Sequence, residues 1–319
     1  MTQRKLCASV LDAIGDTPLV ELSRITAGYE GRVFAKLEYF NPGYSKKDRI
    51  ARQMIEDAER AGALKPGDTV VELTSGNTGT GLAIVCAAKG YRFVAVMSRG
   101  NSVERARMMK ALGAEVLLVD QCHDSTPGEV TGADLARVEE KAREIARQRR
   151  AFRADQFQLP GNARAHYRHT APEIMRQSGG IDAFCDFVGS GGSFAGCAQY
   201  FKESDPAIRC YVVEPEGAAA IAGGPVTHAK HRIQGGGYAM PELAQIDRAL
   251  IDGFLQVSDT DALEMTRRLA KEEGLFAGIS SGANLAAALQ LLRGAHHGER
   301  IAILLSDSGL KYLSTDLWA

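Results

Sequence analysis

The chain has 319 residues, with 38 basic and 39 acidic side chains and a formal net charge of -1. This length is sufficient for a well-buried core and predicts two lobes, because a domain commonly has about 100 to 200 residues. The balanced charge gives no basis for a surface that binds nucleic acid or anionic membrane, so the expected partners are small molecules.

No apolar run approaches the roughly 20 residues that span a bilayer. The N-terminal segment MTQRKLCASV lacks the apolar core of a signal peptide, so we expect a cytoplasmic protein. The six cysteines form no C-x-x-C pair, and neither a zinc site nor a disulfide framework is indicated. Most of them are expected to be small buried apolar residues in a reducing compartment.

Apolar, β-branched runs alternate with helical stretches in the first half of the chain. This pattern is typical of parallel sheets covered by helices, and it predicts an α/β fold. Glycines at the ends of the helical stretches supply C-caps. The expected strands are 69–73, 92–98 and 114–120, and the expected helices are 81–90 and 103–113.

The second half of the chain repeats this alternation. Residues 121–132 are rich in turn formers and predict a loop, which also has the character of an insertion. The glycine-dense stretch 223–241 is expected to be a loop that either approaches a ligand or is plain irregular coil. The further expected strands are 183–189, 210–215 and 301–307, and the further expected helices are 133–150 and 261–274.

The motif TSGNTG (74–79) lies where the first predicted strand ends and a helix begins, which is where α/β proteins bind ligands. The N–H groups of that helix start, with the hydroxyls of Thr74, Ser75 and Thr78, suit a carboxylate or a phosphate. The alternative is a capped turn without a ligand. Asn77 fits that alternative less well, because its neighbours already supply a cap.

The motif GSGGS (189–193) has the same position in the second half. Its three glycines let the backbone fold closely around a tetrahedral anion with the amides pointing inward. Neither glycine cluster has the spacing of the dinucleotide fingerprint, and no lysine is placed as in a P-loop. The sequence therefore does not indicate NAD or ATP.

Nine motifs together resemble the cysteine synthase and cystathionine β-synthase family, pyridoxal-phosphate (PLP) enzymes with the tryptophan-synthase-β-like fold, called fold type II. The resemblance implies two lobes, each with a mostly parallel sheet flanked by helices. Residues 40–150 would form a smaller mobile domain, and 1–39 with 151–319 a larger one that binds the cofactor phosphate. It also implies a homodimer. The motifs are IGDTPLV, NPGYSKKDRIA, TSGNTG, DQF, HYRHTAPEI, GSGGS, IQG, GISSGA and SDSGLKYLST.

The family pattern N-P-x-x-S-x-K-D-R, placed on residues 41–49, puts Lys47 at the position of the lysine that binds the cofactor. Lys46 occupies a position where the family has an apolar residue. We expect Lys46 to be a solvated lysine on the helix face. The alternative is a functional cation that lowers the pKa of Lys47 or attracts an anionic substrate.

The resemblance also implies the other contacts of the cofactor. Asn77 would bind the 3'-oxygen of the ring, and Ser308 would face the pyridine nitrogen. A neutral hydroxyl there leaves the nitrogen largely unprotonated, which favours loss of a β-leaving group over a long-lived carbanion. Asp307 is expected to be structural. The phosphate would be bound by Gly189, Ser190, Gly191, Gly192 and Ser193.

The substrate-binding residues follow in the same way. Gly235 would line the entrance opposite the cofactor, and His166 and His169 are expected to have packing roles. No metal site is expected. The α-carboxylate of the substrate would be bound by Thr74, Ser75, Thr78 and Gln156.

The implied reaction is a β-replacement that converts an activated serine, such as O-acetylserine or O-phosphoserine, through an α-aminoacrylate to cysteine or a related β-substituted alanine. Lys47 would remove and return the Cα proton. The chain would then be a transferase of amino-acid biosynthesis, and two alternative functions remain open. One is a β-eliminating lyase similar to serine or threonine dehydratase, and the other is a non-catalytic binding partner with the same fold.

Departures from the family pattern leave the leaving group and the nucleophile open. The stretch MSRGNS (97–102) introduces Arg99, and IQGGGYA (233–239) introduces Gly236 and Tyr238. Arg99 or Lys46 could favour an anionic substrate such as O-phosphoserine, or an anionic nucleophile.

Overall fold

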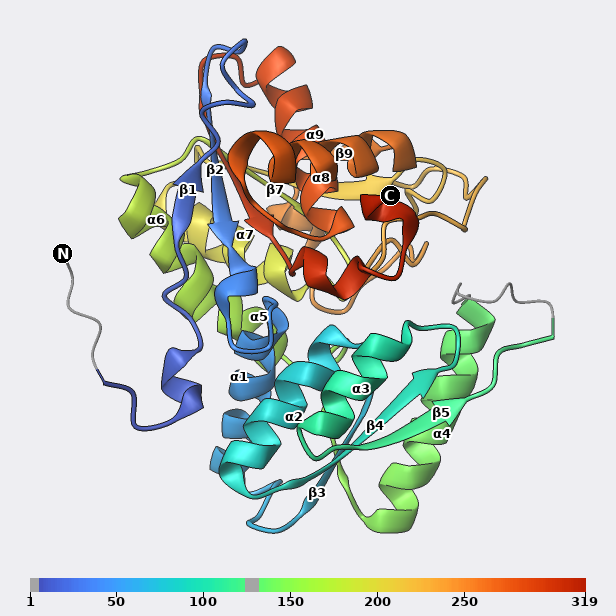
Figure 1. Ribbon diagram of the computed structural model, residues 1–319. Coiled ribbons are helices and arrows are strands. Elements are labelled where there is room, and N and C mark those ends of the chain that lie inside the picture. The colour runs from blue at the N-terminus through green and yellow to red at the C-terminus, as the bar shows by residue number, and fades with distance from the viewer. Residues whose placement is uncertain (1–5, 124–131) are drawn as a thin grey trace.

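The computed structural model describes residues 6–123 and 132–319. Within these ranges two separate sheets form, each flanked by helices (Figure 1). The larger sheet has six strands in the order β1-β2-β10-β7-β8-β9, with every pair parallel except the antiparallel pair β1 and β2. Its strands are β1 (Leu19–Glu21), β2 (Arg32–Leu37), β7 (Ala183–Phe187), β8 (Arg209–Pro215), β9 (Gly253–Val257) and β10 (Arg300–Leu305).

The smaller sheet has four parallel strands in the order β5-β4-β3-β6 within the described ranges. Side chains alternate between its two faces, as the period of two in a strand requires. Val70 and Phe93 pack on the side of α1, α2 and α3, whereas Val71 and Val94 pack on the side of α4. The elements are β3 (Thr69–Leu73), β4 (Arg92–Ser98), β5 (Glu115–Val119), β6 (Phe152–Arg153), α1 (Lys47–Arg60), α2 (Asn77–Lys89), α3 (Val103–Ala111) and α4 (Gly132–Arg149).

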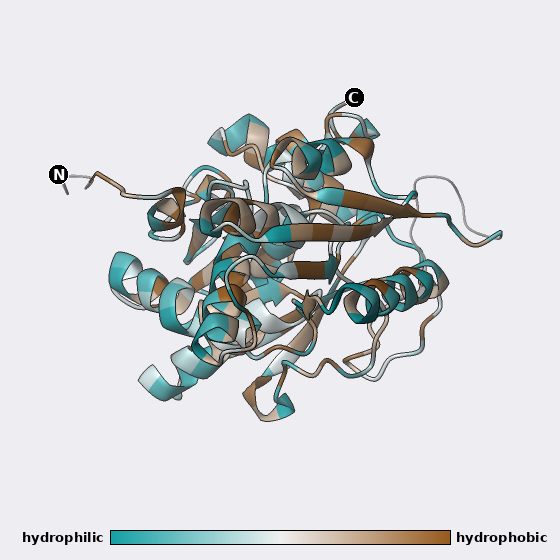
Figure 2. Cartoon of the chain, turned by 90° about the horizontal axis from the view of Figure 1, so that it is seen from below, coloured by the Kyte–Doolittle hydropathy of each residue, from teal (hydrophilic) through white to brown (hydrophobic). Residues whose placement is uncertain are grey.

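The larger sheet is also covered on both faces, which explains why its central strands are almost entirely apolar. Ile303 of β10 packs towards α8 and α9, and Leu304 packs towards α6 and α7. Figure 2 shows the apolar strands inside the molecule and polar helix surfaces outside. The helices are α5 (Gly161–Ala165), α6 (Ala171–Ser178), α7 (Gly192–Ser204), α8 (Asp259–Glu273) and α9 (Ile279–Arg293), with a π-helical turn at His166–Thr170 between α5 and α6.

The α/β fold is confirmed, and the strands predicted at 69–73 and 92–98 match β3 and β4 at both ends. The helix predicted at 81–90 begins earlier, at Asn77, and ends at the left-handed Gly90 as expected. The loop predicted at 121–132 falls mostly on residues 124–131, which lie outside the described part. Within the described part, no helix is long and apolar enough to cross a membrane.

The carboxyl ends of three strands position the motifs found in the sequence. TSGNTG follows β3, GSGGS follows β7, and Ser308 follows β10. The segment before α1 joins this group, because Ser45 forms a β-bridge with Asp307 and the Lys46 N–H donates to the Ser306 carbonyl at 2.9 Å. These segments lie between the two sheets (Figure 1). The fold thus brings together residues that are up to about 260 positions apart.

Candidate active site

Lys47 is the first residue of α1, and its amine has no hydrogen-bond or ion-pair partner in the described part of the chain. The side chain is only partly exposed. Burial lowers its pKa to about 7, with the positive charge of Lys46 as a second cause, while Asp186 and Asp307 act in the opposite direction. The amine is therefore about half neutral at neutral pH, which suits a nucleophile or a base.

The prediction that Lys46 is a solvated lysine on the helix face is wrong. Lys46 is only 6% exposed. Its amine donates to the Ser193 hydroxyl at 2.8 Å and forms an ion pair with Asp186 at 3.2 Å. Asp186 lies inside the buried strand β7, and no sequence period connects it with Lys46. The only sequence signal was the presence of a charged residue in an otherwise apolar strand.

Arg49, one turn after Lys46, anchors the start of α1 to the larger sheet. Its guanidinium binds Glu38 at 2.7 and 2.8 Å and Glu173 at 2.7 and 2.8 Å, and it is 3% exposed. Lys36 binds the same Glu173 carboxylate at 2.7 Å. This buried network was not predicted from the sequence. It holds the residues next to Lys47 in a fixed position.

The GSGGS loop forms a narrow turn between β7 and α7. A side chain at Gly192 would overlap Asn162, with its Cβ 2.0 Å from Oδ1, and Gly191 has a φ of +83°. The N–H groups of Gly189, Ser190 and Gly191 donate to no acceptor in the described part of the chain. Together with the N-terminus of the 13-residue helix α7, they form a site for an anion.

The hydroxyls of this loop are held from behind. Asn162 donates to the Ser190 hydroxyl at 2.9 Å, and Ser193 donates to the Asp186 carboxylate at 2.5 Å. Gly235 packs against the loop so closely that a Cβ added at Gly189 would lie 2.6 Å from the Gly235 carbonyl oxygen. The structure thus places the predicted entrance residue Gly235 directly beside the predicted phosphate loop.

Asn77 begins α2, and two residues from the C-terminal segment bind its amide. Its nitrogen donates to Asp307 at 2.8 Å, and its oxygen accepts from Lys311 at 2.6 Å. Tyr312 donates to the same Asp307 carboxylate at 3.0 Å. The amide nitrogen has two hydrogens, so one remains for a ligand. Lys311 and Tyr312 were missed, because nothing in the local sequence links them to Asn77.

Ser308 lies on the same segment. Its hydroxyl accepts from the Leu310 N–H at 3.3 Å, and its own N–H donates to the Tyr44 carbonyl at 3.2 Å. The hydroxyl hydrogen is still available for donation. Burial lowers the pKa of Lys311 to about 8, with the charges of Asp307 and Asp48 acting in the opposite direction.

The four predicted carboxylate-binding residues lie together at the start of α2. The Thr78 hydroxyl donates to the Gln156 side chain at 2.7 Å. The Thr74 hydroxyl accepts from the N–H groups of Gly76 and Gly79 at 3.0 and 2.9 Å, so it caps the helix. The N–H groups of Asn77 and Thr78 have no partner within the helix, because they lie in its first turn.

Arg105 of α3 is a further residue that the sequence analysis missed. It is 4% exposed, donates to the Ser75 carbonyl at 2.8 Å and to the Gln234 side chain at 3.0 Å. Its guanidinium lies 5.6 Å from the ring centre of Tyr312. All of these partners are neutral. No carboxylate in the described part of the chain pairs with Arg105, so no ion pair compensates its positive charge behind Ser75.

Tyr238 and Gly236 lie in the loop that covers the site. The Tyr238 ring is 6.2 Å from the ring of Phe157, and burial raises the pKa of Tyr238 while a hydrogen bond with the Ser75 side chain acts in the opposite direction. Gly236 allows close packing, because a Cβ there would lie 2.4 Å from the Val188 carbonyl oxygen. Tyr238 therefore borders Ser75, and Gly236 lets the loop pack closely against the end of β7.

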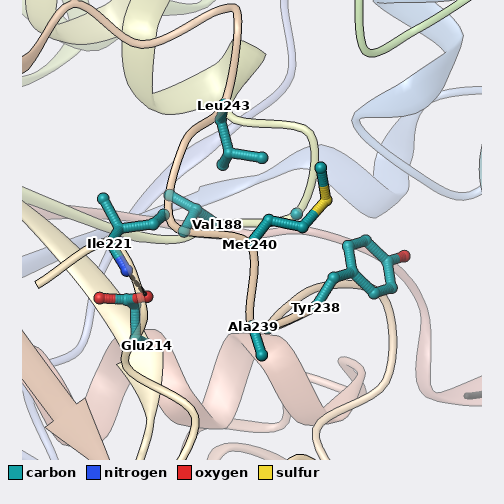
Figure 3. Close-up of a pocket in the computed structure, with 9 residues that line it drawn as sticks. Val188, Glu214, Ile221, Tyr238, Ala239, Met240 and Leu243 are labelled. Atoms are coloured by element: carbon teal, nitrogen blue, oxygen red, sulfur yellow. Dashed lines mark hydrogen bonds between the residues drawn. The ribbon is translucent and has the colours of Figure 1, made fainter. Parts of the chain in front are cut away.

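A small pocket lies on the other side of this loop (Figure 3). It is lined by Val188, Glu214, Ile221 and Met240, and the hydroxyl of Tyr238 points away from it. Its volume of about 10 Å³ is close to the minimum for one water molecule. The pocket is therefore too small for an organic ligand.

Arg99 lies at the end of β4, where its side chain is 57% exposed and pairs with Asp120 at 2.5 Å. His166 is fully buried, with Nδ1 2.9 Å from the Thr170 hydroxyl. Burial, with the nearby cations Lys46 and Arg49, lowers the pKa of His166 well below its usual range, so the ring is neutral. The described part of the chain contains no group of three His, Cys, Asp or Glu residues that could hold a metal ion.

Residues 10–307 match the family of pyridoxal-phosphate-dependent enzymes. The chain belongs to this family. It is 41% identical to a cysteine synthase of Staphylococcus aureus over 98% of this chain and 97% of that protein. A crystal structure of O-ureido-L-serine synthase superposes with a TM-score of 0.88 at 41% identity, covering 98% and 96% of the two chains. An O-acetylserine-dependent cystathionine β-synthase from Helicobacter pylori superposes with a TM-score of 0.88 at 34% identity, covering 99% and 100%.

These matches confirm the predicted family and the fold of type II PLP enzymes. The protein is a PLP-dependent enzyme that catalyses β-replacement on an activated serine, and its substrates are small molecules of amino-acid metabolism. The reading as a non-catalytic binding partner is thereby set aside.

Proposed function

We propose that Lys47 carries the cofactor between two groups of contacts. The observation that supports this most strongly is the position of its amine, which has no partner among the described residues. The negative charges of Asp186 and Asp307 both raise the pKa of this amine. Asp186 binds Ser193 of the GSGGS loop, and Asp307 binds Asn77. An amine between these two groups can reach a cofactor whose phosphate lies at one group and whose ring lies at the other.

The residues present fit the cofactor in each part of the site. The N–H groups of Gly189, Ser190 and Gly191, which donate to no acceptor among the described residues, would hold the phosphate together with the start of α7. The loop is too narrow for a side chain at Gly192. Asn77 would donate its second amide hydrogen to the 3'-oxygen, and Ser308 would donate to the ring nitrogen. When bound, the cofactor supplies an electron-withdrawing ring that acidifies the Cα proton and permits loss of the β-substituent.

The chain's own residues would bind, orient and deprotonate the substrate. The N–H groups at the start of α2, with Thr78 and Gln156, would bind the α-carboxylate, and the uncompensated charge of Arg105 would favour an anion there. Lys47, half neutral near pH 7, would take the Cα proton and return it after the nucleophile has added.

We further propose that the activated serine carries a neutral ester, as in O-acetylserine. Each of the two cations that could recognise a phosphate ester has another place in the structure. Arg99 pairs with Asp120 on the surface, and Lys46 contacts the GSGGS loop, where the phosphate of the cofactor would bind. A third cation, Arg105, lies beside Ser75, where it would attract the α-carboxylate of the substrate. Both the neutral and the phosphorylated serine esters have this carboxylate, so Arg105 would not distinguish between them.

The test is a comparison of O-acetyl-L-serine and O-phospho-L-serine as donors, with sulfide as the nucleophile and cysteine as the measured product. The neutral ester should have the higher kcat/KM, and Arg99→Ala should change the ratio of the two donors by less than about twofold, because an exposed ion pair contributes little. Arg105→Met should lower kcat/KM for both donors. A preference for the phosphorylated donor that is lost in Arg99→Ala would overturn the neutral-ester proposal.

We propose that residues 40–150 form the smaller mobile domain and that 1–39 with 151–319 form the larger one. The strands β3, β4 and β5 fall inside the first range, and β6, at 152–153, lies just beyond it. A homodimer in the cytoplasm is proposed from the family resemblance. Sedimentation of the purified protein would test the dimer.

A further inference from the structure

The strongest unexplained feature is a fully buried ion pair between the residue before Lys47 and the strand before the phosphate loop. Lys46 is 6% exposed and Asp186 is 0% exposed. Placing two charges inside a protein costs several kcal/mol per ion unless hydrogen bonds satisfy both. The family resemblance places an apolar residue at position 46, so the fold does not require a charge there. The pair therefore needs a reason beyond the fold.

The hydrogen bonds around the pair connect it to the loop. Asp186 accepts from Lys46 at 3.2 Å, from Ser193 at 2.5 Å and from Asn284 at 3.2 Å, which satisfies the carboxylate. The Ser193 hydroxyl has one hydrogen, and Asp186 accepts it. Ser193 therefore has no hydrogen left for a phosphate oxygen. It accepts from Lys46 at 2.8 Å instead.

Lys46 is left with an unused donor at the same place. An ammonium group has three hydrogens, and the Lys46 amine donates to both Asp186 oxygens, at 3.3 and 3.2 Å, and to the Ser193 hydroxyl at 2.8 Å. The two Asp186 distances are nearly equal and long, the geometry of one hydrogen shared between both oxygens, so the third hydrogen remains available. The amine lies within hydrogen-bond distance of the loop residue that ends the anion site. A charged donor there binds a phosphate dianion more strongly than a neutral hydroxyl does.

We propose that Lys46 is a cofactor-binding residue in this enzyme, a cation that binds the phosphate of the cofactor in place of the Ser193 hydroxyl, with Asp186 holding its amine against the loop. This inference rests on the proposed role of the GSGGS loop. In the family pattern an apolar residue occupies this position, whereas here Lys46 would bind the phosphate. The same arrangement explains why the pair is buried next to Lys47.

The test compares the dissociation constants of pyridoxal phosphate and of pyridoxal, which lacks the phosphate, for the apo protein. The readout is the ratio of the two constants, because a change at Lys47 alone would alter both constants together. The variants are Lys46→Met, whose unbranched side chain is one atom shorter, and Lys46→Met combined with Asp186→Asn. The double variant removes both charges, so its thermal midpoint should recover towards that of the native protein.

The proposal predicts that the preference for the phosphorylated form falls about ten- to a hundredfold in both variants, the contribution of one hydrogen bond to a charged group. The ³¹P resonance of the bound cofactor should also shift in both. An unchanged ratio in the double variant would overturn the proposal and leave the pair a structural role. If the native protein itself binds the two compounds equally, the phosphate loop of the proposed function fails instead.

Discussion

The pKa of Lys47 predicts how fast the apo protein captures its cofactor at each pH. Only the neutral amine attacks an aldehyde. With a pKa of about 7, roughly half of the Lys47 amines are neutral at pH 7. An ordinary lysine with a pKa of 10.5 would have only about one in three thousand, so the shift contributes about three orders of magnitude to the reactive fraction.

The assay mixes apo protein with pyridoxal phosphate in a stopped-flow instrument and follows the visible absorption of the lysine-bound cofactor from about pH 5.5 to about pH 9.5. The reaction of pyridoxal phosphate with a small free amine, measured at the same pH values, provides the correction for the ionisation of the cofactor itself. The corrected rate should rise tenfold per pH unit below pH 7 and level off above it.

Lys46→Met should move this midpoint upwards, because the positive charge of Lys46 is one cause of the lowered pKa. Lys89→Met serves as the control, since Lys89 pairs with Glu59 on another helix and should leave the midpoint unchanged. A corrected rate in the native protein that still rises tenfold per unit between pH 8 and 9 would refute the lowered pKa of Lys47.

Two further predictions concern the frame of the site. Arg49→Met leaves buried carboxylates without their cation and should lower the free energy of urea unfolding by about 3 to 5 kcal/mol. Arg143→Met removes an exposed pair and should lower it by less than about 1 kcal/mol. Similar losses in the two variants would contradict the buried network. Gly192→Ala should displace Asn162 and weaken cofactor binding at least about tenfold. Gly28→Ala, where a Cβ meets no atom, should leave cofactor binding unchanged. Normal cofactor binding by both variants would contradict the narrow loop.

Local sequence signals were sufficient for the central elements of the fold. The runs that became β3 and β4 are mostly apolar, because both faces of their sheet are covered, and their ends are marked by turn residues and charges. The first strands, β1 and β2, and the edge strand β9 were not predicted. β1 has only three residues, β2 carries two charged residues, and β9 is only partly buried. All three become strands by pairing with neighbours in the sheet.

The motif residues of the site were also visible in the sequence, since glycines and helix-start hydroxyls act through local backbone geometry. The charged residues were not. Lys46 is buried because Asp186, 140 positions away, accepts its charge, and Arg105 reaches Gln234 across 129 positions. A lysine or arginine read alone is most often solvated, so only the tertiary structure could reveal these contacts.

The central claim is that Lys47, and not the adjacent Lys46, carries the cofactor. Reduction of the loaded enzyme with borohydride fixes the cofactor to its lysine, and peptide mass spectrometry then locates the modified residue. The account predicts modification of Lys47, with none at Lys46, and loss of all modification in Lys47→Ala. Modification of Lys46, or of Lys311 beside Asn77, would contradict it.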